Sequence, residues 1–555
     1  MLTATNSYCA SRYAYQRRRT REVAIGSVGV GGEQPIRVQS MTTTRTQDVE
    51  GTLAQTVRLI EAGCEIVRIT APTVSDAKAI GEIRRRLLAR GLSVPLVADI
   101  HFSPAAALEA AEHVDKVRVN PGNFADQKFF RVREYTDADY AAELERIEER
   151  FAPLVVKCRD RGVAMRIGSN HGSLSDRVMN RYGDTPAGMV ESALEFVRIA
   201  EKLRYFDIVL SMKASNPKIM IQAYRLLVAR MDEEGMAYPL HLGVTEAGLG
   251  EDGRIKSAVG IGALLDDGLG DTVRVSLTEE PEAEIPVAAR LVAPYNAGLP
   301  GARSFARQAL PERVDPYSYA RRRTSAADVG IAVGDGAPVA VVEPAEEAFA
   351  GGTPDLEALA CLDGPVVWYD AVRAYRALVA RLDHDGDPRP VHLALALDEA
   401  DAADSLEVLL RSATVLGSLL CDGIGDSVGL VAPQGAQERE RLLFGILQAA
   451  SVRITKTEFV SCPSCGRTLF DLQDTTERIR SQTDHLKGVK IAIMGCVVNG
   501  PGEMADADFG YVGGSPGHVN LYVGKDVVEK SVPEAEADDR LVQLIKSRGR
   551  WVEPA

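Results

Sequence analysis

The stretch that decides the fold of this chain runs from Glu65 to His101 and reads EIVRITAPTVSDAKAIGEIRRRLLARGLSVPLVADIH. It opens with one short strand-like run, EIVRIT, and closes with another, PLVADIH. Between them, DAKAIGEIRRRLLARG has the apolar spacing of an amphipathic helix and ends in glycine, as helices often do. A strand, a helix and a second strand in this order predict a parallel βαβ unit.

The same alternation extends over the first half of the chain. Strand-like runs occur at Ile36–Met41, Glu65–Thr70, Pro95–His101, Asp115–Asn120, Ala164–Asn170, Asp207–Lys213, Leu240–Glu246 and Thr272–Leu277. Eight strands alternating with helices predict a closed (β/α)₈ TIM barrel, an α/β fold. A doubly wound open sheet is the alternative. We place this barrel at residues 1–298, an insert at 299–436 and a C-terminal domain at 437–555, since 555 residues exceed one ordinary domain.

The charge and the N-terminus limit the classes of function. A net charge of −14 argues against nonspecific binding to nucleic acid or anionic membranes, and no apolar run is long enough to span a bilayer. The first twenty residues lack the apolar core of a secretory signal. They are rich in arginine and poor in acids, a weak indication of a transit peptide. We expect a bacterial cytoplasmic protein and hold a plastid stroma as the second choice.

Polar side chains gather where the predicted strands end. They are Arg68, Asp99, His101, Arg118, Asn120, Arg166, Asn170, Lys213, Glu246, Arg274 and Ser276. In a TIM barrel the carboxyl ends of the strands form the active-site rim, so these residues should converge. Guanidinium groups match phosphate oxygens, and the sequence therefore predicts a phosphate or diphosphate pocket. Asp99 and Glu246 would stay ionised there and bind substrate hydroxyls or move protons.

Two pairs of passages resemble each other and indicate a partial duplication. SAVGIGALLDDGLGDTV begins at Ser257 and SATVLGSLLCDGIGDSV at Ser412, while YAYQRRRT begins at Tyr13 and YSYARRRT at Tyr317. In the second copy, Gly429 and Val431 stand where the first has Arg274 and Ser276. We therefore expect the insert to be a barrel-like α/β domain without a phosphate site, acting as a structural spacer.

The C-terminal domain contains three cysteines near one another. FVSCPSCGRTLF holds Cys462 and Cys465, and MGCVVNGPGE holds Cys496 and Glu503. A helix is predicted over Gly466–Thr483, strands over Val489–Met494, Asp508–Gly514 and His518–Gly524, and a closing helix over Asp538–Gly549, which together form an α+β domain. The spacing leaves three sites open: a structural zinc, a thioredoxin-like dithiol, or an iron–sulfur cluster with a carboxylate such as Glu503 as the fourth ligand.

These motifs, in this order, resemble the 4-hydroxy-3-methylbut-2-en-1-yl diphosphate synthase family of the non-mevalonate isoprenoid pathway. The resemblance is carried by PIRVQSMTTT, ADIHF, VRVNPGN, RIGSNHGSLSDR, SMKAS, GVTEAG, GDTVRVSLTEEP, SCPSCGRT and GCVVNGPGE, which cover nearly the whole chain. The insert is similar to that of the longer variant of the family, in which a barrel-like domain separates the barrel from the cluster domain.

The resemblance implies an iron–sulfur oxidoreductase with a 4Fe-4S cluster bound by Cys462, Cys465, Cys496 and Glu503. The implied reaction is ring opening and reductive dehydroxylation of 2-C-methyl-D-erythritol 2,4-cyclodiphosphate, with electrons from ferredoxin or flavodoxin. The substrate-binding residues implied are Arg68, Arg118, Asn120, Arg166, Asn170, Lys213, Arg274 and Ser276. Asp99 would lie near the hydroxyl-bearing carbons, and Glu246 would transfer a proton.

The cluster must reach the barrel mouth although the insert separates the two in sequence. We expect the end domains to close over the substrate, either within one chain or between the two chains of a homodimer. Two rival interpretations remain: a pterin- or corrinoid-type barrel transferase with a structural zinc, and a non-enzymatic zinc-stabilised binding module. The convergent cations argue against the second, because a scaffold needs no phosphate donors.

Overall fold

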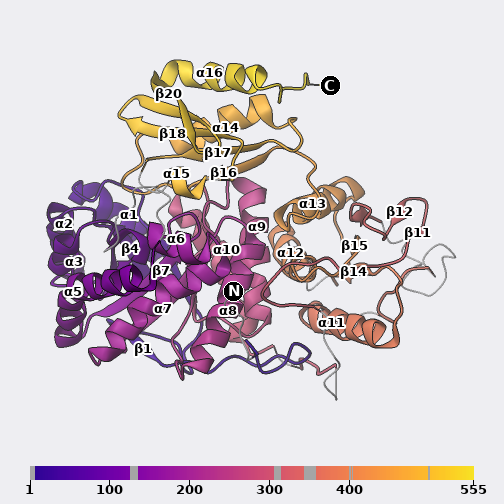
Figure 1. The fold of residues 1–555 in the computed structure, drawn as a ribbon, viewed down its shortest axis with the longest axis horizontal. Helices are drawn as coiled ribbons and strands as arrows, with labels where there is room; N and C mark the ends of the chain where they lie inside the picture. The colour runs from indigo at the N-terminus through magenta and orange to yellow at the C-terminus, as the bar shows by residue number, and fades with distance from the viewer. Residues whose placement is uncertain are drawn as a thin grey trace.

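The structure of the chain, a computed structural model, describes most of its 555 residues. The described residues are 7–124, 135–299, 301–305, 314–342, 358–364, 366–398, 402, 404–497, 500–504 and 506–554, with the side chains of Pro501 and Glu503 outside the description. Figure 1 shows the barrel in indigo to magenta, the insert in orange beside it, and the C-terminal domain in yellow above the barrel.

Eight parallel strands form the predicted barrel. They are β3 (Arg37–Met41), β4 (Ile66–Thr70), β5 (Leu96–Asp99), β6 (Lys116–Val119), β7 (Ala164–Asn170), β8 (Ile208–Lys213), β9 (His241–Leu242) and β10 (Thr272–Val273). Their order along the sheet is β8-β7-β6-β5-β4-β3-β10-β9. A parallel bridge between Leu210 and Leu240 brings β8 to β9 and closes the ring. The open-sheet alternative is therefore wrong.

Helices surround the barrel as the alternation predicts. They are α1 (Val49–Glu61), α2 (Val74–Ala89), α3 (Pro104–Ala110), α4 (Pro121–Phe124), α5 (Asp137–Arg161), α6 (Asp176–Tyr182), α7 (Pro186–Lys202), α8 (Pro217–Glu233), α9 (Gly250–Asp266) and α10 (Glu284–Asn296), with a 3₁₀ turn η1 (Pro281–Ala283). Helix α2 begins at a capping box between Thr73 and Asp76, and it buries Ile80, Ile83 and Leu87 at helical spacing.

A short hairpin that we did not predict closes the amino-terminal end of the barrel. Strands β1 (Val23–Ile25) and β2 (Val28–Val30) pair antiparallel. Val23, Ile25 and Val30 pack against the first residues of β4 and β7 and against Val97 and Val209. This apolar plug seals one end, so that the other end, where the strands point, is the open mouth.

The insert is a parallel α/β unit. Its sheet has the order β13-β15-β14, and a separate hairpin joins β11 to β12. The elements are β11 (Ala327–Asp328), β12 (Ala332–Val333), β13 (Ala340–Val341), α11 (Trp368–Asp385), β14 (His392–Ala396), α12 (Ser405–Cys421), β15 (Ser427–Val431) and α13 (Ala436–Ala449). Helix α13 contacts β13 and β15. The division of the chain at 436/437 thus falls at the start of this helix, and the domain limits stay a prediction.

Equivalent ion pairs support the predicted duplication. Arg17 bonds Asp271 in the barrel at 3.3 Å, and Arg321 bonds Asp426 in the insert at 2.9 Å. Thr20 and Thr324 bond the same two aspartates, each at 3.1 Å. The two arginine–threonine pairs occupy matching positions of YAYQRRRT and YSYARRRT, as do the two aspartates of the other repeated passage.

The insert is fixed to the barrel through buried charges. Helix α9 packs on α12, the two helices of the duplicated passages. Arg225 bonds Asp267 at 2.8 Å and Asp422 at 2.6 Å. Arg376 bonds the same two aspartates, each at 2.8 Å. Breaking one buried pair leaves an uncompensated charge, so this interface favours one fixed arrangement.

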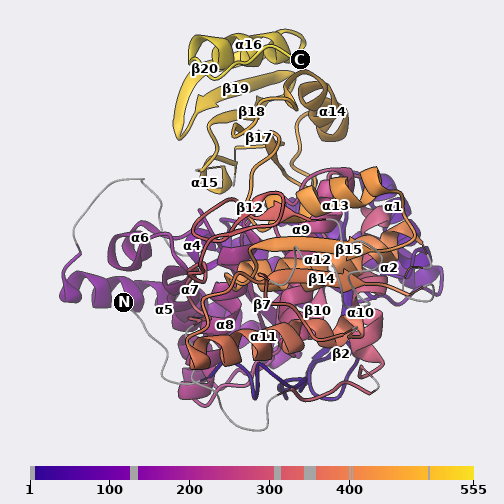
Figure 2. The ribbon, with the colours of Figure 1, turned by 90° about the vertical axis from the view of Figure 1, so that its right-hand side faces the viewer.

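The C-terminal domain is the predicted α+β unit. Its elements are β16 (Glu458–Ser461), α14 (Leu472–Thr483), β17 (Lys490–Met494), α15 (Gly500–Glu503), β18 (Phe509–Ser515), β19 (His518–Val523), β20 (Asp526–Pro533) and α16 (Glu534–Ser547), and the sheet order is β16 to β20 in sequence. Figure 2 shows α16 on the far side of this sheet from the barrel and α15 on the near side. No helix in the described part of the chain combines the length and apolarity needed to cross a bilayer.

Several predicted bounds were wrong. The helix expected from Gly466 begins at Leu472, because the cysteine loop intervenes and Asp471 caps the helix. The loop after Cys496 contains the short helix α15, and strand β20 was not predicted. Strands β9 and β10 end at Leu242 and Val273, where the chain turns into the segments that form the mouth.

Candidate functional site

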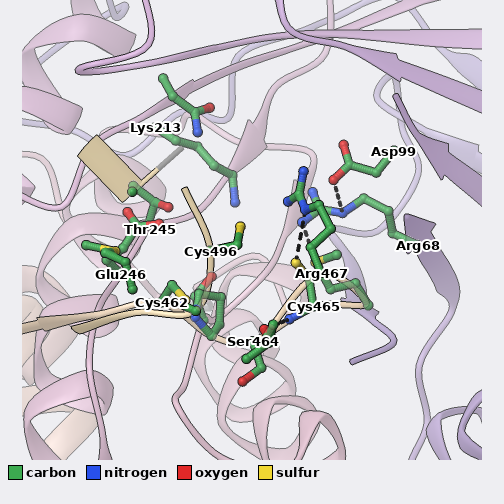
Figure 3. Close-up of a pocket in the computed structure, with 18 of the residues that line it drawn as sticks. Arg68, Asp99, Lys213, Thr245, Glu246, Cys462, Ser464, Cys465, Arg467 and Cys496 are labelled. Atoms are coloured by element: carbon green, nitrogen blue, oxygen red, sulfur yellow. Dashed lines mark hydrogen bonds and ion pairs between the residues drawn. The ribbon is translucent and has the colours of Figure 1, made fainter. Parts of the chain in front are cut away.

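A cavity of about 720 Å³, part of it open to solvent, lies between the barrel mouth and the C-terminal domain. Figure 3 shows side chains entering it from both domains. The predicted site residues that line it are Arg68, Asp99, Arg118, Arg166, Asn170, Lys213, Glu246, Arg274, Ser276, Cys462, Cys465 and Cys496.

Strand register brings the barrel residues together. Arg118 lies opposite Asp99 on β5 and opposite Arg166 on β7, and Asn170 lies opposite Lys213. All five are buried. Because these strands are parallel neighbours, side chains near their carboxyl ends meet at one rim. The Nη2 of Arg118 also donates to the Oδ1 of Asn170 at 3.3 Å.

Asp99 is an ionised carboxylate held between cations. Arg118 Nη1 lies 3.0 Å from its Oδ1, and Arg68 Nε lies 3.9 Å from its Oδ2. Burial alone would raise the pKa of Asp99, but the guanidinium groups of Arg118 and Arg68 hold it well below its usual range. Asp99 therefore orients two of the arginines that face the cavity.

The cations of the mouth outnumber the carboxylates that face them. Burial, followed by the charges of Arg166 and Arg68, lowers the pKa of Lys213 well below 10.5. Burial and neighbouring guanidinium groups also lower the pKa of Arg68 to about 10. Crowded, desolvated cations are stabilised by a bound anion, so the mouth is suited to a multiply charged one.

Arg274 is positioned by a carboxylate that sequence reasoning missed. Its Nε donates to Glu284 Oε2 at 3.0 Å and its Nη2 to Glu284 Oε1 at 2.9 Å. Ser40 donates to the same carboxylate at 2.6 Å. Glu284 begins α10, so only the folding of that helix onto β3 places it here. The bidentate pair fixes the direction of the guanidinium.

Replacing Glu284 by alanine should strongly destabilise the barrel. The side chains of Arg274 and Glu284 are 3% and 0% exposed, so the substitution leaves a buried charge unpaired, at a cost of about 3–5 kcal/mol. Denaturant unfolding monitored by circular dichroism measures this cost. Glu282→Ala is the control, because its partner Arg58 is 51% exposed and such pairs contribute about 1 kcal/mol or less. Equal losses in the free energy of unfolding for Glu284→Ala and Glu282→Ala would contradict a strongly stabilising Arg274–Glu284 pair.

Glu246 lies on the opposite side of the mouth from Asp99 (Figure 3). It is 3% exposed and has a φ of +47°, a conformation that non-glycine residues rarely adopt. Ser464, between two cysteines of the same cavity, has a φ of +54°. Strained residues cluster at functional sites. Glu246 and Ser464 belong to different domains but line the same cavity.

Two predicted site residues do not line the cavity in the described part of the chain. Asn120 is buried, and its Oδ1 accepts from Gly122 N at 3.2 Å, a local turn at the start of α4. Its role in substrate binding stays a prediction. Glu503 belongs to α15, but its side chain lies outside the described residues, so its role as a ligand also stays a prediction.

The three cysteines come from loops that leave neighbouring strands. Cys462 and Cys465 follow β16, Cys496 follows β17, and these strands are paired. Burial raises the pKa of the Cys462 thiol, to which the Gly495 amide donates at 3.3 Å. Thiols in such surroundings become good anionic ligands when a metal supplies positive charge.

Among the described residues, no three His, Cys, Asp or Glu side chains are placed to hold one metal ion. The thiols of Cys462, Cys465 and Cys496 nevertheless line one cavity. In an iron–sulfur cluster each thiolate binds a different iron, so a cluster does not need three ligands around a single ion.

The C-terminal domain contacts the barrel mouth of its own chain. Thr278, which follows β10, shares a hydrogen bond of 2.7 Å with Ser461 and donates to the carbonyl of Cys462 at 3.2 Å. Gly466 lies so close to the barrel that an added Cβ would come within 2.5 Å of the Thr44 carbonyl. The expectation that the end domains can close within one chain is thus met.

Further residues of the cavity were not among the predicted site residues. Met41 and Thr245 come from the barrel, and Arg467 and Thr468 from the C-terminal domain. His101, expected at the rim without an assigned role, also lines the cavity. His101 is a neutral ring, because burial and the charge of Arg467 lower its pKa well below 6.5. The arginine in SCPSCGRT, two residues after the second cysteine, was the available signal for Arg467.

Comparison with family models gives two matches at the two ends of the chain. Residues 20–289 match the model described as the GcpE TIM-barrel domain, and residues 458–547 match that of the GcpE protein C-terminal domain. The matched segments contain all the residues that line the cavity.

Relatives resemble the chain over its whole length. One from Akkermansia muciniphila is 51% identical over 99% of this chain and 100% of its own, and one from Leptospira interrogans is 45% identical over 99% of both; both are named 4-hydroxy-3-methylbut-2-en-1-yl diphosphate synthase (flavodoxin). The chloroplastic ferredoxin enzyme of Arabidopsis thaliana is 43% identical over 100% of this chain and 90% of its own. Among solved structures, dihydropteroate synthase from Xanthomonas albilineans matches 51% of this chain and 99% of its own at 13% identity with a TM-score of 0.35, which is too low to argue from.

Proposed function

The chain belongs to the 4-hydroxy-3-methylbut-2-en-1-yl diphosphate synthase family, and on this basis we propose how its cavity performs the reaction of that family. The enzyme converts 2-C-methyl-D-erythritol 2,4-cyclodiphosphate into 4-hydroxy-3-methylbut-2-enyl diphosphate in the non-mevalonate pathway. Two electrons and a proton enter, a ring C–O bond breaks and a hydroxyl leaves as water. Family membership rules out both the transferase and the binding-module interpretations.

One observation carries the assignment of the site: three cysteines and a ring of cations line the same cavity. We propose that Cys462, Cys465 and Cys496, with Glu503, hold a 4Fe-4S cluster. When bound, such a cluster supplies single electrons and a Lewis-acidic iron, which no side chain can replace. Three thiols that line one cavity are the donor set this group uses.

The barrel residues hold the diphosphate. Arg68, Arg118, Arg166, Lys213 and Arg274 supply positive charge and donors, with Ser276, Asn170 and Asn120 adding neutral donors. Asp99 keeps Arg68 and Arg118 turned toward the cavity, and Glu284 does the same for Arg274. Anchoring the diphosphate places the hydroxyl-bearing carbons toward the cysteine loops, because those loops form the opposite wall.

Glu246 is the proposed proton donor for the departing hydroxyl. It is buried near the cysteine side of the cavity and close to the thiol of Cys462. A positioned carboxyl group can pass a proton to a leaving oxygen as negative charge develops there. The docked C-terminal domain excludes water from this side.

Partners and compartment follow from the relatives in general terms only. The names of the relatives support flavodoxin or ferredoxin as the electron donor. We propose a bacterial cytoplasmic enzyme, since the Akkermansia muciniphila relative is 51% identical and the chloroplastic one of Arabidopsis thaliana 43% identical, with a plastid stroma as the alternative. The insert acts as a spacer that sets the position of the cluster domain, and a homodimer is not required to complete the cavity.

The activity is tested with anaerobically purified, iron- and sulfide-reconstituted protein and a chemical one-electron reductant. We expect consumption of the cyclic diphosphate and formation of the allylic diphosphate, identified by phosphorus NMR and mass spectrometry. A colourless protein that retains one zinc and leaves the substrate intact under these conditions would overturn the assignment.

Binding of the substrate should take up protons at neutral to mildly alkaline pH. In the free protein the pKa of Lys213 lies well below 10.5, so the amine is neutral above that lowered pKa. A bound diphosphate favours the ammonium form of Lys213 and raises its pKa. Neither phosphate of the cyclic ester carries a proton that titrates in this pH range. Calorimetry in buffers of different ionisation enthalpy measures the uptake, and Lys213→Met should reduce it. Proton release would contradict this account.

A further inference from the structure

The guanidinium of Arg467 lies at the junction between the cysteine loop and the barrel mouth. It belongs to the C-terminal domain, two residues after Cys465, and its Nε donates to the Cys465 sulfur at 3.3 Å. Figure 3 shows it between Cys465 and the pair formed by Arg68 and Asp99. Its Nη1 is buried and, among the described residues, has no hydrogen-bond partner.

A buried guanidinium donor without an acceptor is costly, because burial removes the water that would otherwise satisfy it. The nearest carboxylate does not meet this need. Asp99 already accepts from Arg118 at 3.0 Å and lies 3.9 Å from Arg68. The cavity that Arg467 lines is open enough for a ligand, so an anionic ligand is the natural acceptor for its free N–H group.

We propose that Arg467 is a substrate-binding residue that donates to the diphosphate from the cluster-domain side of the cavity. The proposal rests on the proposed function, since it takes the cyclic diphosphate as the ligand. It adds a contact from the domain opposite the barrel cations. One bound substrate then joins the two domains directly.

The same geometry couples binding to domain docking. Without an anion, docking brings Arg467 toward Arg68 and Arg118, and like charges in a buried site repel. With the diphosphate in place, all three cations face an anion. The C-terminal domain therefore docks on the barrel more favourably when substrate is bound. The Thr278–Ser461 contact lies at this junction, so its surroundings report on docking.

The test measures substrate affinity by calorimetry on anaerobic, cluster-loaded protein without reductant, so that no turnover occurs. We expect Arg467→Met to weaken binding of the cyclic diphosphate by about 10- to 100-fold, the effect of losing one charge-assisted contact. The affinity of Arg467→Lys should lie between those of the wild type and Arg467→Met. Lysine keeps the positive charge but lacks the forked pair of N–H donors of a guanidinium. Arg478→Met is the matched control from the same domain, because Arg478 pairs with Asp538 on the surface.

Hydrogen exchange separates substrate binding from a structural role. Exchange of the amides in residues 458–462 should slow on adding substrate to the wild type and to Arg478→Met, but far less in Arg467→Met. Iron content and the visible spectrum report whether the cysteine loop is intact, and Arg467→Lys provides the comparison if the methionine variant loses iron.

The outcomes distinguish this proposal from the proposed function. If the wild type binds the cyclic diphosphate and Arg467→Met binds it equally tightly, the role of Arg467 is refuted while the function stands. If the wild type itself fails to bind the cyclic diphosphate, the proposed function fails. Weak binding by Arg467→Met with unchanged exchange protection would refute the coupling to docking.

Discussion

The Cys496→Ala variant should have no measurable activity and should contain markedly less iron than the wild type. Cys496 lines the cavity on the loop after β17, and the loop that carries Cys462 and Cys465 leaves the neighbouring strand. Removing one of three thiolates leaves an iron without its protein ligand, and neither water nor a backbone carbonyl is an equivalent replacement. Iron and sulfide analysis with a turnover assay on anaerobically reconstituted protein measures both effects.

Cys361→Ala is the matched control for this experiment. Cys361 is an exposed cysteine of the insert, on the chain between the two end domains. Its replacement should leave iron content and turnover at the wild-type level. Wild-type iron content and activity in Cys496→Ala would remove the basis for placing a cluster at these cysteines.

The second large effect is expected for Lys213→Met. The amino group of Lys213 lies at the end of β8 among Arg166, Arg68 and Arg274, where a bound diphosphate favours its charged form, and the side chain is buried. Truncating a buried charged partner of a ligand typically costs 2–5 kcal/mol, so the affinity for the cyclic diphosphate should fall by about 30- to 1,000-fold. Methionine keeps most of the volume, so the fold should be retained. Calorimetry without reductant measures the affinity.

Lys202→Met removes a lysine of the same barrel without touching the cavity. Lys202 ends α7 and pairs with Glu148 at the surface, with its side chain 65% exposed. Its replacement should leave the affinity unchanged. A loss of affinity of less than threefold in Lys213→Met would show that the mouth does not bind the diphosphate as described.

The barrel was predictable because its signals are local. Each strand is a short run such as EIVRIT, each helix has apolar residues at helical spacing, and eight repeats leave few topologies. The hairpin of β1 and β2 was missed because its runs are only three residues long and are stabilised by contacts with Val97 and Val209, which are distant in sequence.

The site was predictable where a residue's position on a strand determined its role. Lys213 ends β8, Arg118 is the last residue but one of β6, and Arg166 faces Arg118 from β7, so the barrel alone brings them together. Glu284 could not be found in this way, since it begins a helix and meets Arg274 only through tertiary packing. Asn120 also follows a strand, and a local turn with Gly122 uses its side-chain oxygen, so its role in substrate binding stays a prediction.

The relation between the domains depended on contacts that no motif encodes. The sequence left closure within one chain and closure between chains equally open. In the structure, a chain brings its own end domains together through the Thr278–Ser461 contact and the close approach of Gly466 to Thr44. The buried pairs of Arg225 and Arg376 with Asp422 fix the insert that separates the two ends in sequence.

The central claim is that one chain builds the complete site, and mixing two inactive variants tests it most directly. Cys496→Ala retains an intact barrel mouth, and Lys213→Met retains an intact cluster domain. The two are co-expressed with different tags, purified through both tags, reconstituted and assayed for turnover. We predict no activity beyond that of the separate variants. Recovered activity would mean that a barrel uses the cluster domain of another chain, and would contradict the claim.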